Sequence, residues 1–332
     1  RERGMSGMGS LALNGSGNVM LTGANSYAGG TTVSGGTLTG TTTSLQGNIL
    51  NNAAVVFDQG TNGTYAGAMS GTGGLTKSGI GNVTLAGANT YSGGTTVSAG
   101  TLTGTTTSLQ GNIVNNAALV FDQATNGTYA GAISGPGSLT KIGAGVLSLT
   151  GNSVVGGGTT VSAGTLAVNG RLTSNVVVGP GGTLGGSGTI VGNFASTGGI
   201  VAPGNSIGTL SITGNFSQTG GVYQVEANSA GQSDKIVATG TATIGGGATV
   251  QVLAAYVGIA AAPHCGQVSA PELTGTAGAA LAGWSGGGAA GSCGWVAGSC
   301  GWVAPAGRPG TGISAAPHWS QNRALAGLST PH

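Results

Sequence analysis

The sequence predicts an all-β protein, a right-handed parallel β-helix (solenoid), with an irregular or disordered C-terminal tail. Three observations support this prediction: the composition, a long internal repeat, and short segments in which apolar and polar residues alternate. Such a coil stacks one short unit repeatedly, so that each unit buries the apolar face of its neighbour.

The composition favours short strands joined by tight turns. Glycine supplies 73 of the 332 residues and charged residues only 4%, whereas ordinary globular proteins are about a quarter charged. Because ordering glycine costs much backbone entropy, a fold so rich in it needs dense and regular backbone pairing. Glycine does not recur at every third position, which excludes collagen. The diffuse net charge of +2 predicts no nucleic-acid partner.

The repeat is seen most clearly at three leucines, Leu21, Leu85 and Leu149, which are separated by the same interval. The segments 9–72 and 73–136 align without a gap and agree at about three quarters of their positions. A third, incomplete copy runs from residue 137 to about 168. We expect each copy to form three turns of about 21 residues. Strands are predicted where residues alternate, at 83–85, 95–97, 117–121 and 146–149.

A whole number of turns per repeat has consequences for the geometry. Residues one repeat apart should then occupy the same corner of the coil, so that Phe57 lies in line with Phe121, and Tyr65 with Tyr129. The polar residues of the repeat should likewise stack as ladders along the coil. These are Asn25 with Asn89, and Thr31-Thr32 with Thr95-Thr96.

The second copy contains the pattern Gly-x-Leu-x-Lys-x-Gly-x-Gly-x-Val-x-Leu, followed by Asn89-Thr90-Tyr91-Ser92-Gly93-Gly94-Thr95-Thr96-Val97. This pattern closely resembles the passenger-associated transport repeat of autotransporters, which are type V secreted proteins. The first copy has Leu13 in place of Lys77, and the third keeps Lys141 but has Ser153-Val154-Val155 in place of the Asn-Thr-Tyr. The resemblance implies a β-helical passenger that is exposed at the cell surface or secreted.

A second resemblance covers residues 181–253. The segments 201–210, with Pro203-Gly204-Asn205-Ser206, and 231–236, with Asp234-Lys235, look like the C-terminal end of such passengers. In that family this region caps the β-helix and promotes folding during export, as an autochaperone. The resemblance also implies an outer-membrane β-barrel translocator as a partner, which we expect to be missing from this chain.

These observations predict four parts. Residues 1–8 are a disordered start, residues 9–168 are the repeats, and residues 169–254 are the autochaperone-like end of the β-helix. Residues 255–332 are an irregular low-complexity tail, because all three cysteines, all four tryptophans and six of nine prolines lie there. We expect this tail to add nothing to the β-helix. Its change in composition after Ala254 fits either an unusual in-frame tail or a shifted reading frame.

The β-helical part contains few residues suited to catalysis. Up to Ala254 it has no histidine, no cysteine and five acidic residues: Glu2, Asp58, Asp122, Glu226 and Asp234. Asp58 and Asp122, three turns apart, would be about 14 Å from each other, too far for a glycosidase pair, and we interpret them as solvated turn residues. Asp234-Lys235 is interpreted as a surface pair or a turn feature. Cys293 and Cys300 lie in a duplicated heptad without zinc-ligand spacing. We therefore expect no catalytic, cofactor-binding or metal-binding residues and no cofactor.

The sequence thus predicts a non-enzymatic passenger fragment that acts as a stalk or adhesin-like module. Its expected partners are glycans or proteins on host or neighbouring cells. The alternative is a carbohydrate-active β-helix enzyme. Three or more carboxylates, or an Arg/Lys cluster, lining a groove would favour the enzyme, whereas an evenly polar and charge-poor surface would favour the stalk or adhesin.

Overall fold

The computed structural model describes residues 4–254, 267–269, 273–275 and 280–282. By its internal packing the chain divides into two compact units, Arg1–Val177 and Val178–His332. Within the described residues all regular structure is β-strand. Apart from three antiparallel strands near its C-terminal end, described below, the paired strands run parallel, and the predicted fold class, a parallel β-solenoid, is confirmed.

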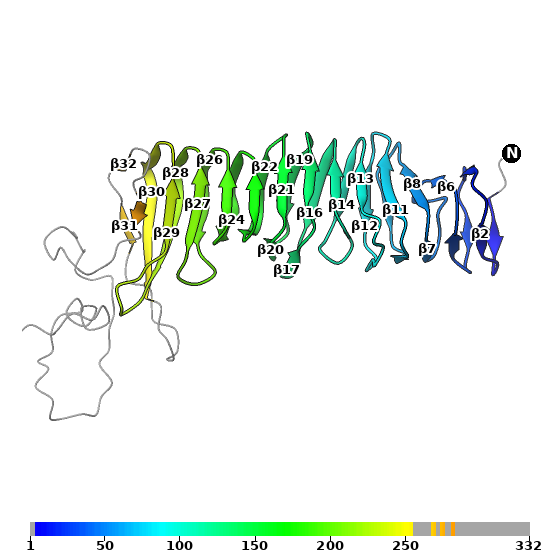
Figure 1. Ribbon diagram of the computed structural model, residues 1–332, viewed down its shortest axis with the longest axis horizontal. Helices are drawn as coiled ribbons and strands as arrows, with labels where there is room; N and C mark the ends of the chain where they lie inside the picture. The colour runs from blue at the N-terminus through cyan, green and yellow to red at the C-terminus, as the bar shows by residue number, and fades with distance from the viewer. Residues whose placement is uncertain (1–3, 255–266, 270–272, 276–279, 283–332) are drawn as a thin grey trace, which may run out of the picture. The chain divides into compact units, whose positions relative to one another are not determined.

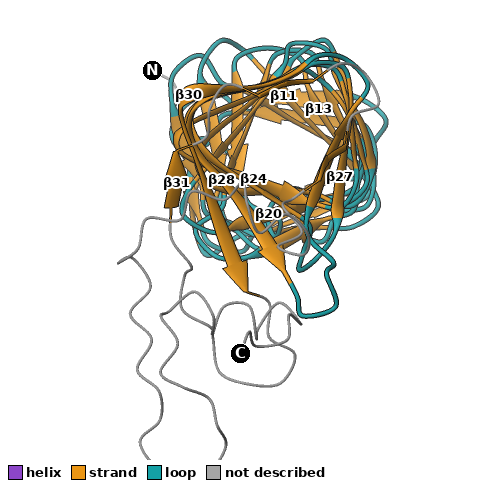
Figure 2. Ribbon diagram, turned by 90° about the vertical axis from the view of Figure 1, so that its left-hand side faces the viewer, coloured by secondary structure: helices purple, strands orange, loops and turns teal. Residues whose placement is uncertain are grey.

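The strands of the first unit stack turn upon turn (Figure 1). They form three main sheets, which are the walls of the coil. The first sheet has the order β2-β5-β7-β10, the second β3-β6-β8-β11-β13-β15-β18-β21-β23, and the third β9-β12-β14-β16-β19-β22. In the end view β11 and β13 lie in one wall and β20 in another (Figure 2). The bounds are β1 Ser6–Gly7, β2 Leu11–Leu13, β3 Asn18–Met20, β4 Ser26–Tyr27, β5 Thr31–Val33, β6 Thr37–Gly40, β7 Ile49–Asn51, β8 Ala54–Asp58, β9 Gly63–Tyr65, β10 Met69–Ser70, β11 Gly74–Ser78, β12 Asn82–Leu85, β13 Thr95–Val97, β14 Thr101–Gly104, β15 Ile113–Asn115, β16 Ala118–Asp122, β17 Gly127–Tyr129, β18 Ile133–Gly135, β19 Ser138–Ile142, β20 Val146–Leu149, β21 Asn152–Val155, β22 Thr159–Val168 and β23 Arg171–Thr173.

The core of this unit follows from the alternation of residues along each strand. In β16, Leu119 and Phe121 are fully buried while Val120 between them is partly exposed, as expected for a wall with one inward face. The four predicted strands are present as β12, β13, β16 and β20. Ser6–Gly7 forms β1 and pairs with β4, so the coil begins earlier than the predicted residue 9.

The prediction that three turns make up one repeat is wrong. Register runs from Val55 to Leu75, then to Thr95 and Ile113, so three turns that start at Val55 end at Ile113. The repeat equivalent of Val55 is Leu119, six residues further along the chain, and those residues carry the chain around a corner onto the third sheet. Individual turns, such as the one from Val55 to Leu75, are shorter than expected. A repeat therefore makes three turns and advances one further wall.

The predicted ladders are wrong for the same reason. Thr31 lies on the first sheet between Leu11 and Ile49, whereas Thr95 lies on the second. Thr31 and Thr95 point inward, and Asn25 and Asn89 are 8% and 4% exposed. These polar residues of the repeat are therefore internal and form no continuous outer ladder.

The second unit has fewer strands, and those of one of its two parallel series are longer. β25 Thr189–Val191, β27 Thr209–Thr213 and β29 Lys235–Ala238 form one parallel series. β24 Val176–Gly186, β26 Phe194–Pro203, β28 Phe216–Ala227 and β30 Ala242–Ala254 form the other. Phe194 and Phe216 are register partners whose rings stack with centroids 5.1 Å apart, a geometry that stabilises neighbouring turns.

Three short strands correct the expectation that residues 255–332 add nothing to the β-helix. β31 Gln267–Ser269 and β32 Leu273–Gly275 pair with β30, and β33 Ala280–Ala282 pairs with β29, all antiparallel. The last strands of a coil leave unpaired backbone groups that can bind any extended segment, and these three segments contain no proline. The tail cysteines and tryptophans lie outside the described residues.

Candidate functional site

Asp58 and Asp122, the acidic residues of the repeat, are exposed at the ends of β8 and β16. They lie on the second and third sheets, not in line on one wall as the expected spacing of about 14 Å assumed. Asp58 accepts a hydrogen bond of 3.1 Å from the Ser78 hydroxyl, its partner on the next turn. The repeats thus bring no carboxylate pair together from these two positions.

Lys77 and Lys141 are the polar residues that sequence reasoning overlooked. Both are completely buried. The Lys77 Nζ donates hydrogen bonds to the carbonyl oxygens of Ser78 at 2.7 Å, Gly79 at 2.7 Å and Ala99 at 3.1 Å. The period of two along β11 could have revealed this position, because Leu75 points inward and Lys77 must follow it.

Lys141 repeats this arrangement on another wall. Its Nζ donates to the carbonyl oxygens of Ile142 at 2.7 Å, Gly143 at 2.6 Å and Ala163 at 3.1 Å. Burial lowers the pKa of both lysines, and the carboxylates of Asp58 and Asp122 oppose that change. The two lysines therefore occupy closely similar surroundings on the second and third sheets.

Asn89 connects three successive turns. Its Oδ1 accepts from the Met69 backbone N–H at 2.7 Å, and its Nδ2 donates to the Ser108 carbonyl at 2.6 Å. Asn25 makes the same two bonds in the first copy, and in the third copy the Ser153 hydroxyl accepts from the Ile133 N–H at 3.1 Å. The asparagine that marks the repeat in the sequence thus has a structural role between turns.

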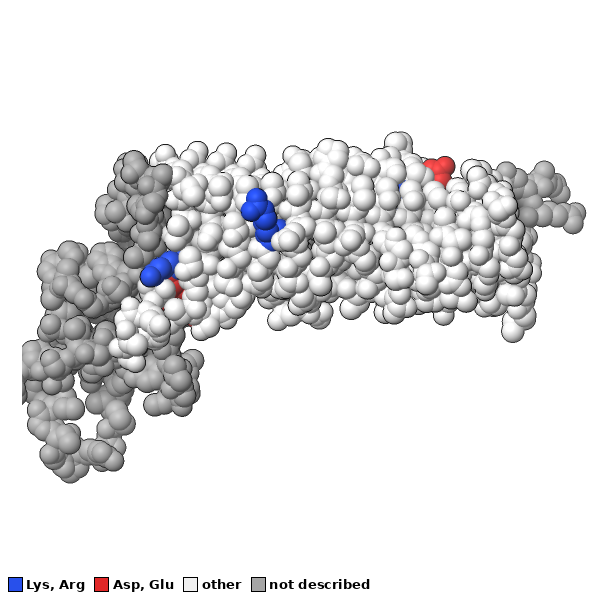
Figure 3. Space-filling view, in the orientation of Figure 1, with Lys and Arg blue, Asp and Glu red and all other residues white. Residues whose placement is uncertain are grey.

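The outward side of the first unit carries small β-branched and hydroxyl side chains. One register series on the second sheet is Thr76, Thr96, Val114, Ser134 and Val154, one residue per turn. Val114 and Val154 are about half exposed. Few charged side chains interrupt the face shown in Figure 3. The series on the second sheet therefore offers a hydroxyl or methyl group at every turn.

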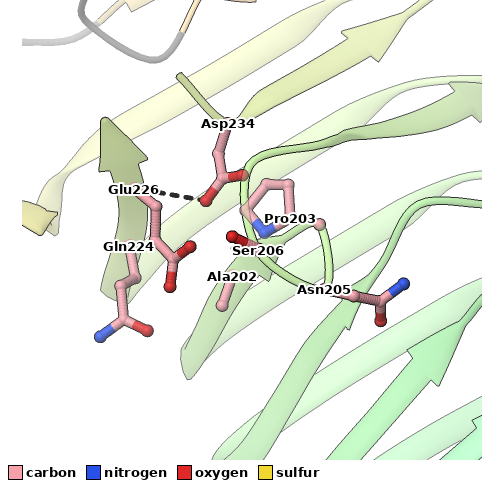
Figure 4. Close-up of a pocket in the computed structure, with 8 residues that line it drawn as sticks. Ala202, Pro203, Asn205, Ser206, Gln224, Glu226 and Asp234 are labelled. Atoms are coloured by element: carbon pink, nitrogen blue, oxygen red, sulfur yellow. Dashed lines mark hydrogen bonds between the residues drawn. The ribbon is translucent and has the colours of Figure 1, made fainter. Parts of the chain in front are cut away.

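The second unit contains a small pocket of about 80 Å³ (Figure 4). It is lined by the 202–206 segment together with Gln224, Glu226 and Asp234. Asp234 is only 2% exposed whereas Lys235 is exposed, so the predicted surface pair is wrong. Its two carboxylate oxygens accept from the backbone N–H groups of Gly208 at 2.8 Å and Glu226 at 2.9 Å.

Asp234 therefore links the two segments that resemble a passenger C-terminal end. Its side chain holds the loop before β27, while the Lys235 N–H donates to the Gly208 carbonyl at 2.9 Å. Burial raises the pKa of the Asp234 carboxyl to about 6, assisted by the Glu226 carboxylate and opposed by the two backbone hydrogen bonds. Both oxygens are already engaged, so the residue is suited to fixing backbone segments.

Two kinds of feature are missing from the described part of the chain. It contains no cluster of three or more His, Cys, Asp or Glu side chains that could hold a metal ion. No helix in those same residues is both long and apolar enough to cross a membrane.

Comparison with known proteins supports the resemblance. The passenger-associated-transport-repeat family matches residues 11–43, 75–107 and 139–168. The chain is 38% identical over 181 residues, 46% of its length, to the adhesin BmaC autotransporter of Brucella suis biovar 1 (strain 1330). It is 40% identical over 126 residues, 38% of its length, to an extracellular serine protease of Serratia marcescens.

These matches cover 5% of the adhesin and 12% of the protease, so the chain spans a small part of both relatives. Each of the three family matches lies within one copy of the repeat, and they begin in β2, β11 and β19. The chain therefore carries three passenger-associated transport repeats, the repeats of autotransporter passengers, and over part of its length it is related to an autotransporter adhesin.

Proposed function

We propose that this chain is a non-enzymatic stalk or adhesin-like segment of a passenger that is surface-exposed or secreted. The observation that carries the proposal is the outward side of the first unit, where hydroxyl and methyl side chains recur at each turn. Such a face suits contact with uncharged glycans or with protein surfaces on host or neighbouring cells. The relative named as an adhesin supports this reading.

The alternative, a carbohydrate-active enzyme, needs a pair of carboxylates within about 10 Å across a substrate groove. In the repeats Asp58 and Asp122 lie on different walls. In the second unit Glu226 and Asp234 share a pocket of only about 80 Å³, and both oxygens of Asp234 accept backbone hydrogen bonds. These features favour the structural role. A translocator domain is the partner that an autotransporter passenger implies.

The test measures binding and hydrolysis with one preparation. We expect the purified chain to bind a subset of immobilised glycans or cultured cells, and to release neither reducing sugar from polysaccharides nor peptides from casein. A Val114→Asp, Val154→Asp variant should lose binding if the second sheet is the contact face. A Thr160→Asp variant on the third sheet is the matched control.

Binding that is unaffected by the Val114→Asp, Val154→Asp variant would rule out the second sheet as the contact face, whereas no binding by the unmodified chain would leave only the stalk role. Catalytic release of sugar or peptide would overturn the non-enzymatic role, and the Asp234→Asn variant would then show whether the pocket is responsible.

A further inference from the structure

The Lys-x-Gly-x-Gly part of the repeat forms a corner whose purpose the passenger role does not explain. It occurs at Lys77 and again at Lys141. In both copies the lysine Nζ contacts three backbone carbonyls, at 2.7, 2.7 and 3.1 Å in one and 2.7, 2.6 and 3.1 Å in the other. The two corners lie on different walls, so the shared geometry comes from the motif itself.

The number of contacts matches the chemistry of the ammonium group. A lysine ammonium has three N–H donors and no acceptor, and three carbonyl oxygens satisfy it without a carboxylate. Two of these oxygens belong to the residues that follow the lysine, and the third, from Ala99 or Ala163, belongs to the next turn. The ammonium therefore joins one turn of the coil to the next.

Glycines keep the corner open for this group. A Cβ atom on Gly100 would lie 2.5 Å from the carbonyl oxygens of both Gly79 and Gly81, and 2.8 Å from the Lys77 Nζ. Gly100 also has φ +66°, and its equivalent Gly164 has φ +63°, which side chains rarely adopt. Gly100 and Gly164, which face the motif from the next turn, thus leave a space that is lined by oxygen atoms and filled by one cation.

We propose that each Lys-x-Gly-x-Gly corner is a binding site for a primary ammonium group, formed by backbone carbonyls and filled by the chain's own lysine. Shortening Lys141 to alanine removes three methylene groups and the nitrogen, which together have the size of n-propylammonium. The site should then accept that ion from solution, because the carbonyls remain and the buried acceptors otherwise lack their donor.

The experiment is chemical rescue of the Lys141→Ala variant of the full chain. We expect its thermal midpoint to lie below that of the unmodified protein and to rise in a saturable manner with n-propylammonium chloride. Tetramethylammonium chloride at the same concentration has the same charge but no N–H, and should give no rescue. An equal shift from both salts, or the same shift in the unmodified protein, would overturn the proposal.

The Lys141→Met variant is the matched control, since methionine fills the apolar space but cannot donate. It should be destabilised and should not respond to n-propylammonium. If it responds as strongly as Lys141→Ala, the ion acts elsewhere and the corner is not the site.

A second measurement keeps the proposal testable if the alanine variant does not fold. The chain has three lysines, and Lys235 is exposed while Lys77 and Lys141 are buried. In ¹⁵N-labelled unmodified protein we expect two side-chain ammonium signals that exchange slowly with water. Ammonium protons of Lys77 and Lys141 that exchange as fast as those of Lys235 would contradict the carbonyl site.

Discussion

Phe57 and Phe121 hold the same position in the repeat, yet Phe57 is in register with Lys77 on the second sheet and Phe121 with Lys141 on the third. Both phenylalanines are fully buried. The ring centroids of Phe57 and Tyr65 are 5.0 Å apart, and those of Phe121 and Tyr129 are 5.2 Å apart. The same local group of side chains is thus built on two different walls. Each wall needs only that alternate residues of a strand be apolar and point inward, so the same repeat can pack on any of the three walls.

The register can be tested by cross-linking. Thr76 and Thr96 are outward-facing partners on adjacent turns, where strands lie about 4.8 Å apart, within the range that a disulfide spans. A Thr76→Cys, Thr96→Cys variant should therefore form this disulfide on oxidation, detected by mass spectrometry of the linked peptides.

The matched control is Thr32→Cys with Thr96→Cys, a pair that is one repeat apart in the sequence. These residues lie on the first and second sheets and should remain unlinked. If Thr76→Cys and Thr96→Cys remain unlinked while exposed thiols are oxidised, the register between these two turns is wrong.

Glycine at the corner of the coil should be intolerant of a side chain. We expect Gly100→Ala to lower the free energy of unfolding by about 2 kcal/mol or more, because of its positive φ and the close carbonyl oxygens. Gly60→Ala should change it by less than about 1 kcal/mol, because open space surrounds that position and the next copy has Ala124 there. Urea denaturation measures both. Similar losses in the two variants would contradict the corner geometry.

The connection made by Asn89 should contribute more than a surface hydrogen bond. Asn89→Ala leaves the Met69 N–H and the Ser108 carbonyl without their partner, at a cost of about 2–4 kcal/mol in the free energy of unfolding. Asn89→Ser should cost less, because Ser153 accepts the same bond in the third copy. Thr90→Ala, at an exposed neighbour, is the control. Equal stability of the alanine and serine variants would show that the accepted bond contributes little.

The stability of the second unit should depend on pH through Asp234. Its pKa is about 6 in the folded chain and 3.8 as an ordinary aspartate. The protonated form is therefore favoured by folding. Its stabilisation is fully present below about pH 4 and is lost as the pH rises through 6, by an amount on the order of 2 kcal/mol once screening by solvent is allowed for.

Thermal midpoints between pH 4 and 7.5 measure this dependence, and the Asp234→Asn variant should lack this part of it. Asparagine presents an N–H group toward a backbone donor, so its midpoint can be lower at every pH. The prediction concerns the slope, and an unchanged slope in the variant would show that another group titrates.

Much of the fold could be predicted from alternation alone. Leu119 and Phe121 flank an outward valine, and that pattern places β16 on a wall correctly. The length of a turn could not be predicted in this way. It depends on the corners, since one turn leads from Leu102 to Leu119 and the next, which is three residues longer, from Leu119 to Leu139. Because the turns differ in length, three of them use fewer residues than one repeat contains, and the remaining residues bring each repeat onto the adjacent wall.

The sequence predicts which polar side chains point inward, but not which groups they contact. The inward position of Lys77 follows from that of Leu75, whereas its acceptor on Ala99 belongs to the next turn and depends on the turn length. For Asp234 even the burial of the side chain could not be predicted. Its neighbour Lys235 is exposed and suggested a surface pair, but the loop around Gly208 covers the carboxylate. That coverage comes from tertiary structure that no local pattern encodes.

The offset of one wall per repeat has a consequence for how such a chain can change through recombination. Unequal crossing-over between two similar copies removes or inserts one whole repeat at once. After such an event the alternating apolar residues still point inward, so the coil continues without interruption and the product can fold. Every outward side chain beyond the junction, however, is rotated to the adjacent wall. Gain or loss of a copy therefore changes which residues share a face without changing a single codon elsewhere, so that length variation in the gene also rearranges the surface.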